Sequence, residues 1–465
     1  MRRLVMTMVL GLLAGTFVSV TATAAEVYGD LQAIVDASAP GSVVMVEPGI
    51  YAGGITIDKP LTLRGSGWPV VDGRGSGTVI TITAPDVTIE GLVVRGSGTS
   101  LDREDTGISV KALRVTLIGN RLEDVLFGIY LLGARDSVIT DNVVGSKEHI
   151  FIANRGDGLR LWESDRSLVE RNVVRNGRDA VFWFTDDVVL RDNEITGGRY
   201  GLHFMYSDRV VVEGNHLVDN SVGSYMMYSV GVTFRNNVFA NNTGPSGYGI
   251  GFKDMDDYVV EGNRFIANRA GLYLDNSPSS ADAEGLVRNN LFAYNQVGAL
   301  FLPAIRNNMV YGNSFIDNVE QVGVTTTGTF KGNDWSVDGR GNYWSDFAGY
   351  DANGDGIGDV SYRVDDLYNT LTDKYPDLQF FQDTPAAKAI ALAAEMFPVL
   401  RPLPLVEDRF PLIKRPELPP IRRLEAVSQA PALALASILM LIGASLVLRI
   451  PSRRQRAYLT KEPIA

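Results

Sequence analysis

The chain has 465 residues, a formal net charge of -11 and no cysteine. This length is sufficient for a large core or for several domains. The acidic balance, without any basic stripe, argues against a nucleic-acid partner. Without cysteine, the chain can form no disulfide, no thiolate metal site and no thiol nucleophile.

Residues 1–24 have the features of a secretory signal peptide. Arg2 and Arg3 precede an apolar run, which ends in the small-residue segment 22–24. This order predicts export of the chain and cleavage of the signal. A lone membrane anchor is the alternative, but the apolar run is short and is interrupted by Thr and Ser.

A short helix is predicted at residues 31–37, ahead of strand-like segments that begin at Val43. This start resembles the amphipathic cap and first turns of parallel β-helices such as the pectate-lyase-like group. Such a fold requires a cap because its first layer otherwise exposes unpaired strand edges.

One pattern of about 15 residues is then repeated in successive copies, spaced roughly 22 residues apart. The clearest copies begin at Gly158, Asp179, Gly201, Gly223 and Gly249. A fixed period of this size, rich in β-branched residues, Gly and Asn, is typical of a solenoid in which each copy is one coil. The sequence therefore predicts an all-β fold, a right-handed parallel β-helix, over residues 25–375.

Aligning the copies assigns the inner and outer faces, because side chains alternate along a strand. The second and fourth positions are apolar nearly throughout and are predicted to face the core. The fifteenth position is asparagine in every copy, which predicts a stacked ladder at a turn. The predicted ladder contains Asn172, Asn193, Asn215, Asn237 and Asn263.

The fifth position points outward in this phase, yet it carries large apolar or thioether side chains. This stripe consists of Trp162, Trp183, Met205 and Met227. His203 lies at the outward third position of the strand that carries Met205. Thioether with imidazole suits Cu(I), and neutral ligands hold it weakly enough for transfer.

We therefore expect His203, Met205 and Met227 to form a transient Cu(I) site, with Trp162 and Trp183 shielding it from water. The alternative is that the stripe only covers a docking surface, since exposed apolar patches mark partners and Met suits adaptable interfaces. The two interpretations are compatible. Insertions in the repeat at 146–158 and 243–248 are predicted to flank the stripe, because functional insertions tend to cluster on one face.

A different unit follows the last coils. Asp351, Asn353, Asp355 and Asp359 alternate with other residues around a tight turn at 351–359. This spacing of oxygen ligands predicts a structural Ca²⁺ loop, although the bidentate Glu of an EF-hand is absent. A metal-free turn is the alternative, since Asp, Asn and Gly are also ordinary turn residues.

The C-terminal part is predicted to leave the solenoid. Residues 376–425 indicate a short helix and a Pro-rich linker, or a strap laid on a partner. The uncharged segment 426–448 is long enough to span a bilayer as a helix, with a buried soluble helix as the alternative. Arginines in the tail 449–465 place that tail in the cytoplasm and the solenoid outside.

The chain contains the runs NRGDGLRLWESD, YGLHFMYSD, GSYMMYS, and GRGNYWSDF with DANGDGIGD. Together these runs resemble the NosD family of periplasmic accessory proteins for the maturation of nitrous oxide reductase. The resemblance spans about residues 27–375. It implies a non-enzymatic periplasmic protein that works with an ABC transporter, made of a cytoplasmic ATPase and a membrane permease. It also implies receipt of copper from a periplasmic lipoprotein chaperone, for the copper sites of the reductase. Anchorage to the inner membrane follows from the predicted span instead.

A carbohydrate-active β-helix enzyme, a lyase, hydrolase or epimerase, is the alternative from another class. The candidate acid and base groups are Asp186, Asp187, Asp254, Asp256 and Asp257. Adjacent carboxylates point to opposite faces of a strand, which disfavours a catalytic pair. A metal-free docking adaptor is the third interpretation.

Overall fold

The computed structural model describes residues 29–325, 332–364, 377, 384–386, 389 and 404–420. The predicted signal peptide at 1–24, the predicted span at 426–448 and the tail at 449–465 lie outside this set. Among the described residues, no helix is long and apolar enough to cross a membrane. The described residues up to Pro419 belong to one compact unit.

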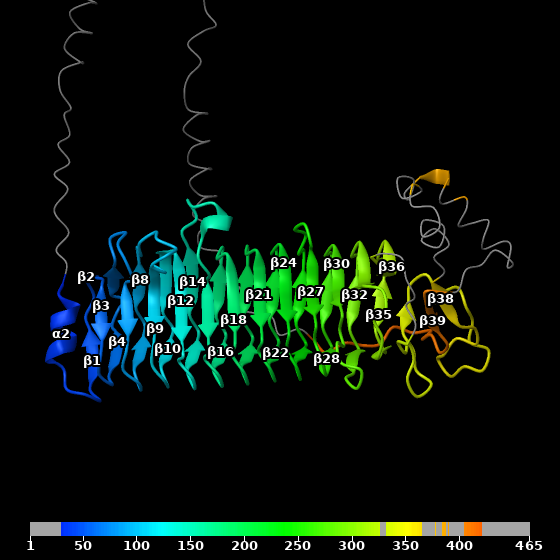
Figure 1. Ribbon diagram of the computed structural model, residues 1–465, viewed down its shortest axis with the longest axis horizontal. Coiled ribbons are helices and arrows are strands. Elements are labelled where there is room, and N and C mark those ends of the chain that lie inside the picture. Colours follow the sequence, from blue (N-terminus) through cyan, green and yellow to red (C-terminus); the bar gives the residue numbers. More distant parts are fainter. Residues whose placement is uncertain are drawn as a thin grey trace, which may run out of the picture. The chain divides into compact units, whose positions relative to one another are not determined.

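Three parallel sheets form the walls of a solenoid, and their strands stack coil upon coil (Figure 1). Sheet I contains β1 (Val43–Val46), β4 (Thr62–Gly65), β7 (Thr88–Glu90), β10 (Thr116–Ile118), β13 (Val138–Thr140), β16 (Leu168–Glu170), β19 (Val189–Arg191), β22 (Val211–Glu213), β25 (Thr233–Arg235), β28 (Tyr258–Glu261), β31 (Gly285–Arg288) and β34 (Asn308–Tyr311). Sheet II contains β2 (Ile50–Ala52), β5 (Val70–Asp72), β8 (Val93–Arg95), β11 (Arg121–Val125), β14 (Val143–Ser146), β17 (Val173–Arg175), β20 (Glu194–Thr196), β23 (His216–Val218), β26 (Val238–Ala240), β29 (Arg264–Ile266), β32 (Leu291–Ala293), β35 (Ser314–Ile316) and β37 (Tyr343–Trp344). Sheet III contains β3 (Ile55–Ile57), β6 (Ile80–Ile82), β9 (Thr106–Val110), β12 (Phe127–Leu132), β15 (Leu159–Trp162), β18 (Asp179–Trp183), β21 (Tyr200–Met205), β24 (Val222–Met227), β27 (Tyr248–Lys253), β30 (Ala270–Asp275), β33 (Val297–Phe301) and β36 (Glu320–Val324). The predicted all-β parallel β-helix is confirmed.

The N-terminal end is closed by helix α2 (Leu31–Ala37), as predicted. The Asp30 side chain accepts the backbone N–H of Ala33 and so caps the helix. Gln32 bonds both the N–H and the carbonyl of Thr56 in β3, at 2.8 and 3.1 Å. The helix therefore satisfies backbone groups of the first strand in sheet III, which stacking leaves without a neighbour.

The interior follows the predicted alternation and is held by asparagine ladders. In the predicted ladder, Asn215 Oδ1 accepts the backbone N–H and the amide of Asn193, both at 2.9 Å. The same pattern extends in both directions, from Asn120 to Asn342. A second ladder runs through Asn220, Asn242, Asn268, Asn295 and Asn318. The sequence alignment missed it because the aligned pattern stops five residues earlier in each coil.

The C-terminal end is closed by the Pro-rich strap, of which residues 404–420 are described. Its strand β39 (Val406–Asp408) pairs antiparallel with β38 (Tyr362–Val364). Asp408 is fully buried, and Asn342 donates its backbone N–H to Asp408 Oδ2 at 2.7 Å. Asp408 thus takes the place of the next asparagine in the ladder. The strap, orange in Figure 1, runs back from β39 toward β28, and Arg264 donates to the Pro419 carbonyl. In these residues the strap lies on the solenoid itself.

The two insertions lie together at one corner of the solenoid. The first contains the 3₁₀ helix η1 (Ile152–Asn154) and connects sheet II to sheet III, as does the second. Ile152 and Thr243 both line an open hollow of about 380 Å³ beside Asn220. Both insertions precede sheet III strands, whereas the stripe lies where such strands end. The insertions therefore border the opposite end of these strands, in contrast to the expectation that they flank the stripe.

Candidate functional site

The predicted stripe lies at the ends of four consecutive strands of sheet III. Trp162 pairs with Trp183, Trp183 with Met205, and Met205 with Met227. All four side chains are half-buried, whereas Met226 next to Met227 is fully buried in the core. The outward phase of the stripe is therefore as predicted, and the two thioether residues are direct neighbours on adjacent strands.

His203 lies on the same outer face, two residues before Met205 in β21, but it is not open to solvent. Only 10% of its side chain is exposed. The Trp183 ring packs perpendicular to the imidazole at 5.4 Å between ring centres, and the Tyr200 ring lies at 4.9 Å. Trp162 in turn packs edge-on against Trp183 at 5.4 Å. The imidazole is thus sheltered by rings from its own and the preceding coil.

A buried carboxylate adjoins this imidazole. Asp179 Oδ2 lies 3.6 Å from His203 Nδ1. Arg199 donates to both carboxylate oxygens, with Nε 3.0 Å from Oδ1, and the Tyr200 N–H lies 3.3 Å from Oδ1. Burial alone raises the pKa of Asp179, but His203 and Arg199 outweigh this effect and hold that pKa below its ordinary value.

A second buried carboxylate lies one coil earlier. Asp157 Oδ1 accepts from Arg178 at 3.0 Å, and Arg160 Nε lies 3.9 Å from Asp157 Oδ2. Burial raises the pKa of Asp157 to about 6, although both arginines oppose this shift. Arg160 also binds Glu104 at 3.0 Å. Arg178 Nε also lies 4.0 Å from Asp179 Oδ2, so these charged groups form a partly buried network that ends beside His203. Sequence reasoning missed this network because its partners come from different coils.

A second aromatic row, which the sequence analysis also missed, borders the stripe. Phe184, Tyr206 and Tyr228 follow the stripe residues in their coils and all have positive φ, at 52°, 52° and 56°. Their rings stack at 5.3 and 4.9 Å between centres, and 45% of Phe184 is exposed. These aromatic residues occupy the sixth position of the aligned copies, so the row could have been found in the sequence. The row extends the apolar surface around Met205 and Met227.

The carboxylates proposed for a carbohydrate enzyme are engaged in turns. Arg209 donates to both Asp186 and Asp187, at 3.0 and 2.7 Å, and lowers the pKa of Asp187. Asp256 accepts from the hydroxyl and backbone groups of Ser279 and Ser280. Despite burial, these hydrogen bonds lower its pKa. A general acid requires a raised pKa, so these two groups do not have that character.

Asp254 and Asp257 also lie in turns, each with a positive φ. Asp254 accepts from the side-chain amide of Asn276, and Asp257 from the backbone N–H of Glu284. Both carboxylates therefore hold neighbouring coils together.

The loop predicted to bind Ca²⁺ is closed by its own hydrogen bonds. Asp351 accepts the backbone N–H groups of Gly354 and Gly356, at 2.6 and 2.8 Å, and Asp359 accepts that of Ala352. Across the described residues, no cluster of three or more His, Cys, Asp or Glu side chains is arranged to hold a metal. Calcium binding by Asp351, Asn353, Asp355 and Asp359 stays a prediction.

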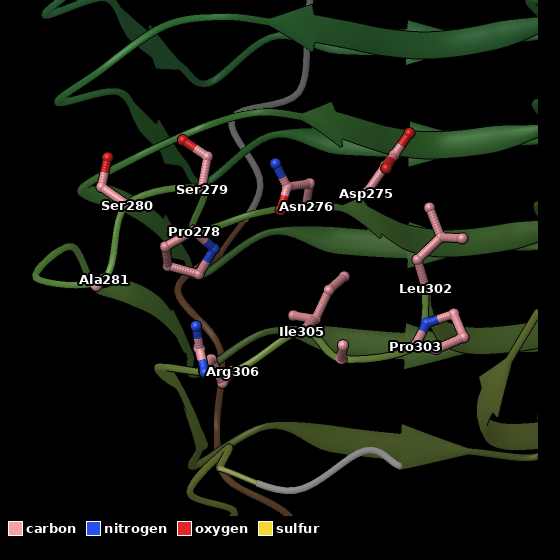
Figure 2. Close-up of a pocket in the computed structure, with 11 residues that line it drawn as sticks. Asp275, Asn276, Pro278, Ser279, Ser280, Ala281, Leu302, Pro303, Ile305 and Arg306 are labelled. Atoms are coloured by element: carbon pink, nitrogen blue, oxygen red, sulfur yellow. The ribbon is translucent and has the colours of Figure 1, made fainter. Parts of the chain in front are cut away.

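A polar pocket lies further along sheet III, in the row of paired positions that contains the stripe. Lys253 pairs with Met227 and Asp275 with Lys253, and Asp275 lines a pocket of about 240 Å³ (Figure 2). Figure 2 shows this pocket between the turn at Pro278 and the turn at Arg306. None of the thioether, indole or imidazole groups of the candidate site lines it.

Fold and site together define a solenoid protein whose outer face presents paired thioethers beside a sheltered imidazole. Residues 145–349 match the family model described as periplasmic copper-binding protein (NosD). The chain is 33% identical over 386 residues to a probable ABC transporter binding protein NosD of Pseudomonas aeruginosa, covering 80% of this chain and 88% of the relative. The corresponding protein of Stutzerimonas stutzeri is 30% identical over 381 residues, covering 79% of this chain and 86% of the relative. The chain belongs to the NosD family.

Among solved structures, the A-module of a mannuronan C-5 epimerase from Azotobacter vinelandii is similar, with a TM-score of 0.48 and 16% identity. The similarity covers 67% of this chain and 96% of that module. At this level the comparison carries no information about activity.

Proposed function

We propose that the protein is a periplasmic accessory protein of an ABC transporter and holds Cu(I) on sheet III before passing it on. Its relatives are named as ABC transporter binding proteins, and its family is described as periplasmic and copper-binding. The transporter partner consists of a permease and an ATPase. A periplasmic lipoprotein chaperone supplies the copper, and nitrous oxide reductase receives it for its copper sites.

The observation that carries this proposal is the direct pairing of Met205 with Met227, with His203 two residues before Met205 on the same face. Thioether sulfur is a soft ligand that selects Cu(I), and imidazole also binds copper. All three ligands are neutral, so they hold a single positive charge without a strong ionic bond. Binding by such a set is reversible, as transfer to another protein requires.

The surrounding rings give the site its shelter. Trp183 and Tyr200 pack on His203, and Trp162 packs on Trp183. A hydrophobic shell of this kind controls solvent access to a metal site. In the proposal, Trp162 and Trp183 therefore keep water and oxidants away from Cu(I).

A metal-free docking adaptor is the second candidate. The row of Phe184, Tyr206 and Tyr228 favours it, because Phe184 and Tyr206 are exposed. Contiguous exposed apolar surface marks sites of interaction with partners. This row adjoins the proposed copper site, so one surface serves both docking and transfer. A carbohydrate enzyme has less support, because Asp187 and Asp256 have lowered pKa values.

An anaerobic titration of the purified full-length protein with Cu(I), in competition with a Cu(I) chelator, tests the proposal. We expect saturation at one Cu(I) per chain. If the protein loses its Cu(I) to a weak chelator, the copper function is contradicted and the metal-free docking adaptor becomes the supported function. Incubation of the same preparation with polyuronides, followed by detection of unsaturated ends, tests lyase activity, and we expect none.

A further inference from the structure

We propose that Asp179 is a positioning residue that fixes the tautomer and orientation of His203, so that His203 Nε2 is presented to Cu(I). This inference rests on the proposed function. Asp179 Oδ2 lies 3.6 Å from His203 Nδ1, and the Asp179 side chain is 1% exposed. Within the described residues, Nδ1 has no acceptor within hydrogen-bond distance.

Asp179 is an exception within the repeat. It occupies the first position of its copy, where the copies around it begin with Gly158, Gly201, Gly223 and Gly249. A buried carboxylate costs desolvation energy that glycine does not. The neighbouring coils avoid this cost with glycine at the same position, and the exception lies in the coil directly before His203.

The strand pairing is also irregular at this point. Asp179 pairs with Tyr200 and Val181 with His203, so β21 contains one residue more than β18 between the two pairs. Such bulges re-aim side chains and recur beside functional sites. Here the irregularity lies between the residue that carries the carboxylate and the residue that carries the imidazole.

The chemistry follows from the two ring nitrogens of histidine. A neutral imidazole has one N–H and one lone pair, and the partner of one nitrogen decides which atom is free to bind metal. A carboxylate beside Nδ1 favours the proton on that atom and leaves the lone pair on Nε2. Moving the ring by about 0.7 Å shortens the contact to an ordinary hydrogen-bond length of about 2.9 Å.

Arg199 holds the carboxylate in place for this role. Its Nε donates to Asp179 Oδ1 at 3.0 Å, and its terminal nitrogen donates to Oδ2. The bidentate arrangement fixes the plane of the carboxylate. Oδ2 is therefore held on the side of His203, and the orientation of the imidazole is coupled to a rigid group.

Asp157 provides a matched control. It is also buried, at 1% exposure, and is also paired with arginine, through Arg178. Its described contacts do not include His203. Asp157→Asn therefore perturbs the same buried network without changing the group beside Nδ1.

The first test is a long-range proton–nitrogen NMR spectrum of copper-free, full-length protein with labelled histidine, at about pH 8, above the usual histidine pKa of about 6.5. The chain has only 3 histidines, and His203→Gln assigns the relevant ring. We expect His203 to carry its proton on Nδ1 in the wild type and in Asp157→Asn. In Asp179→Asn we expect a mixture of tautomers or the reverse one. A proton on Nε2 in the wild type overturns the proposal even if Asp179→Asn fails to fold.

The second test is the affinity for Cu(I) of the same variants. Loss of a residue that orients a ligand costs about 10- to 100-fold in affinity, and we expect this for Asp179→Asn but not for Asp157→Asn. Unchanged affinity in Asp179→Asn with an altered tautomer overturns the positioning role. Unchanged affinity in His203→Gln contradicts the ligand set of the proposed function instead, so the two failures are distinguishable.

Discussion

Replacing both Met205 and Met227 by leucine is expected to abolish the retention of Cu(I) by a correctly folded protein. The two residues are paired neighbours on β21 and β24, half-buried on the outer face. Leucine has a similar volume, so this swap costs little stability. It removes both soft sulfur ligands and leaves a single imidazole. The loss of affinity is therefore expected to exceed the roughly 100-fold that loss of a supporting residue costs.

Met226→Leu is the matched control for this experiment. Met226 is the neighbour of Met227 in the same strand, but its side chain is fully buried in the core. We expect it to retain Cu(I) as the wild type does, with both measurements made anaerobically against the same chelator. Equal retention by the double variant and by Met226→Leu would remove the two stripe methionines as ligands.

Replacing Asp408 by alanine is expected to destabilise the C-terminal end of the solenoid by about 3 kcal/mol, since buried donors left without an acceptor cost about 1–3 kcal/mol each. Asp408 Oδ2 accepts the backbone N–H of Asn342 at 2.7 Å and the indole N–H of Trp344 at 2.9 Å. The Trp344 ring stacks on Phe315 and on Tyr362, at 4.4 and 4.3 Å between centres. Loss of Asp408 therefore weakens the contact that ties the strap to the last coil. The change is measured as the free energy of unfolding in urea.

Asp408→Asn is the comparison variant, because its amide oxygen still accepts from Asn342, as in the rest of the ladder. Burial raises the pKa of Asp408 above its ordinary value. The folded state therefore binds this proton more tightly than the unfolded chain, and the residue's contribution to stability falls as pH rises from about 3.9 through the raised pKa. We expect the wild type to lose stability relative to Asp408→Asn over that range. If the difference in unfolding free energy between the wild type and Asp408→Asn does not change with pH, the proposed cost of burying the Asp408 charge is contradicted.

Much of the fold was predictable because a solenoid repeats its constraints. Each coil buries the same positions, so five aligned copies reveal the phase of alternation and the ladder at Asn215. The helix at 31–37 was predictable from its position ahead of the first strands. The contact of Asp408 with Asn342 was not, because the strap has no period and the two residues are 66 positions apart.

The candidate site was predictable only in part, because the repeat reveals which face a side chain lies on but not which side chains cover it. The alternation of Leu202, His203 and Phe204 placed the imidazole on the outer face. The alternation did not predict that His203 is buried. Burial depends on the covering rings and on Asp179, which the strand pairing and its bulge bring beside the imidazole. Asp179 was visible in the alignment as a departure from glycine, but only the structure gives it a neighbour.

In the proposed function, sulfur from Met205 and Met227 and nitrogen from His203 bind Cu(I) together. X-ray absorption at the copper edge of the full-length protein, loaded anaerobically with one equivalent of Cu(I), measures this ligand set directly. We expect three-coordinate Cu(I) with two sulfur neighbours and one nitrogen neighbour. A spectrum with nitrogen and oxygen neighbours alone would contradict it.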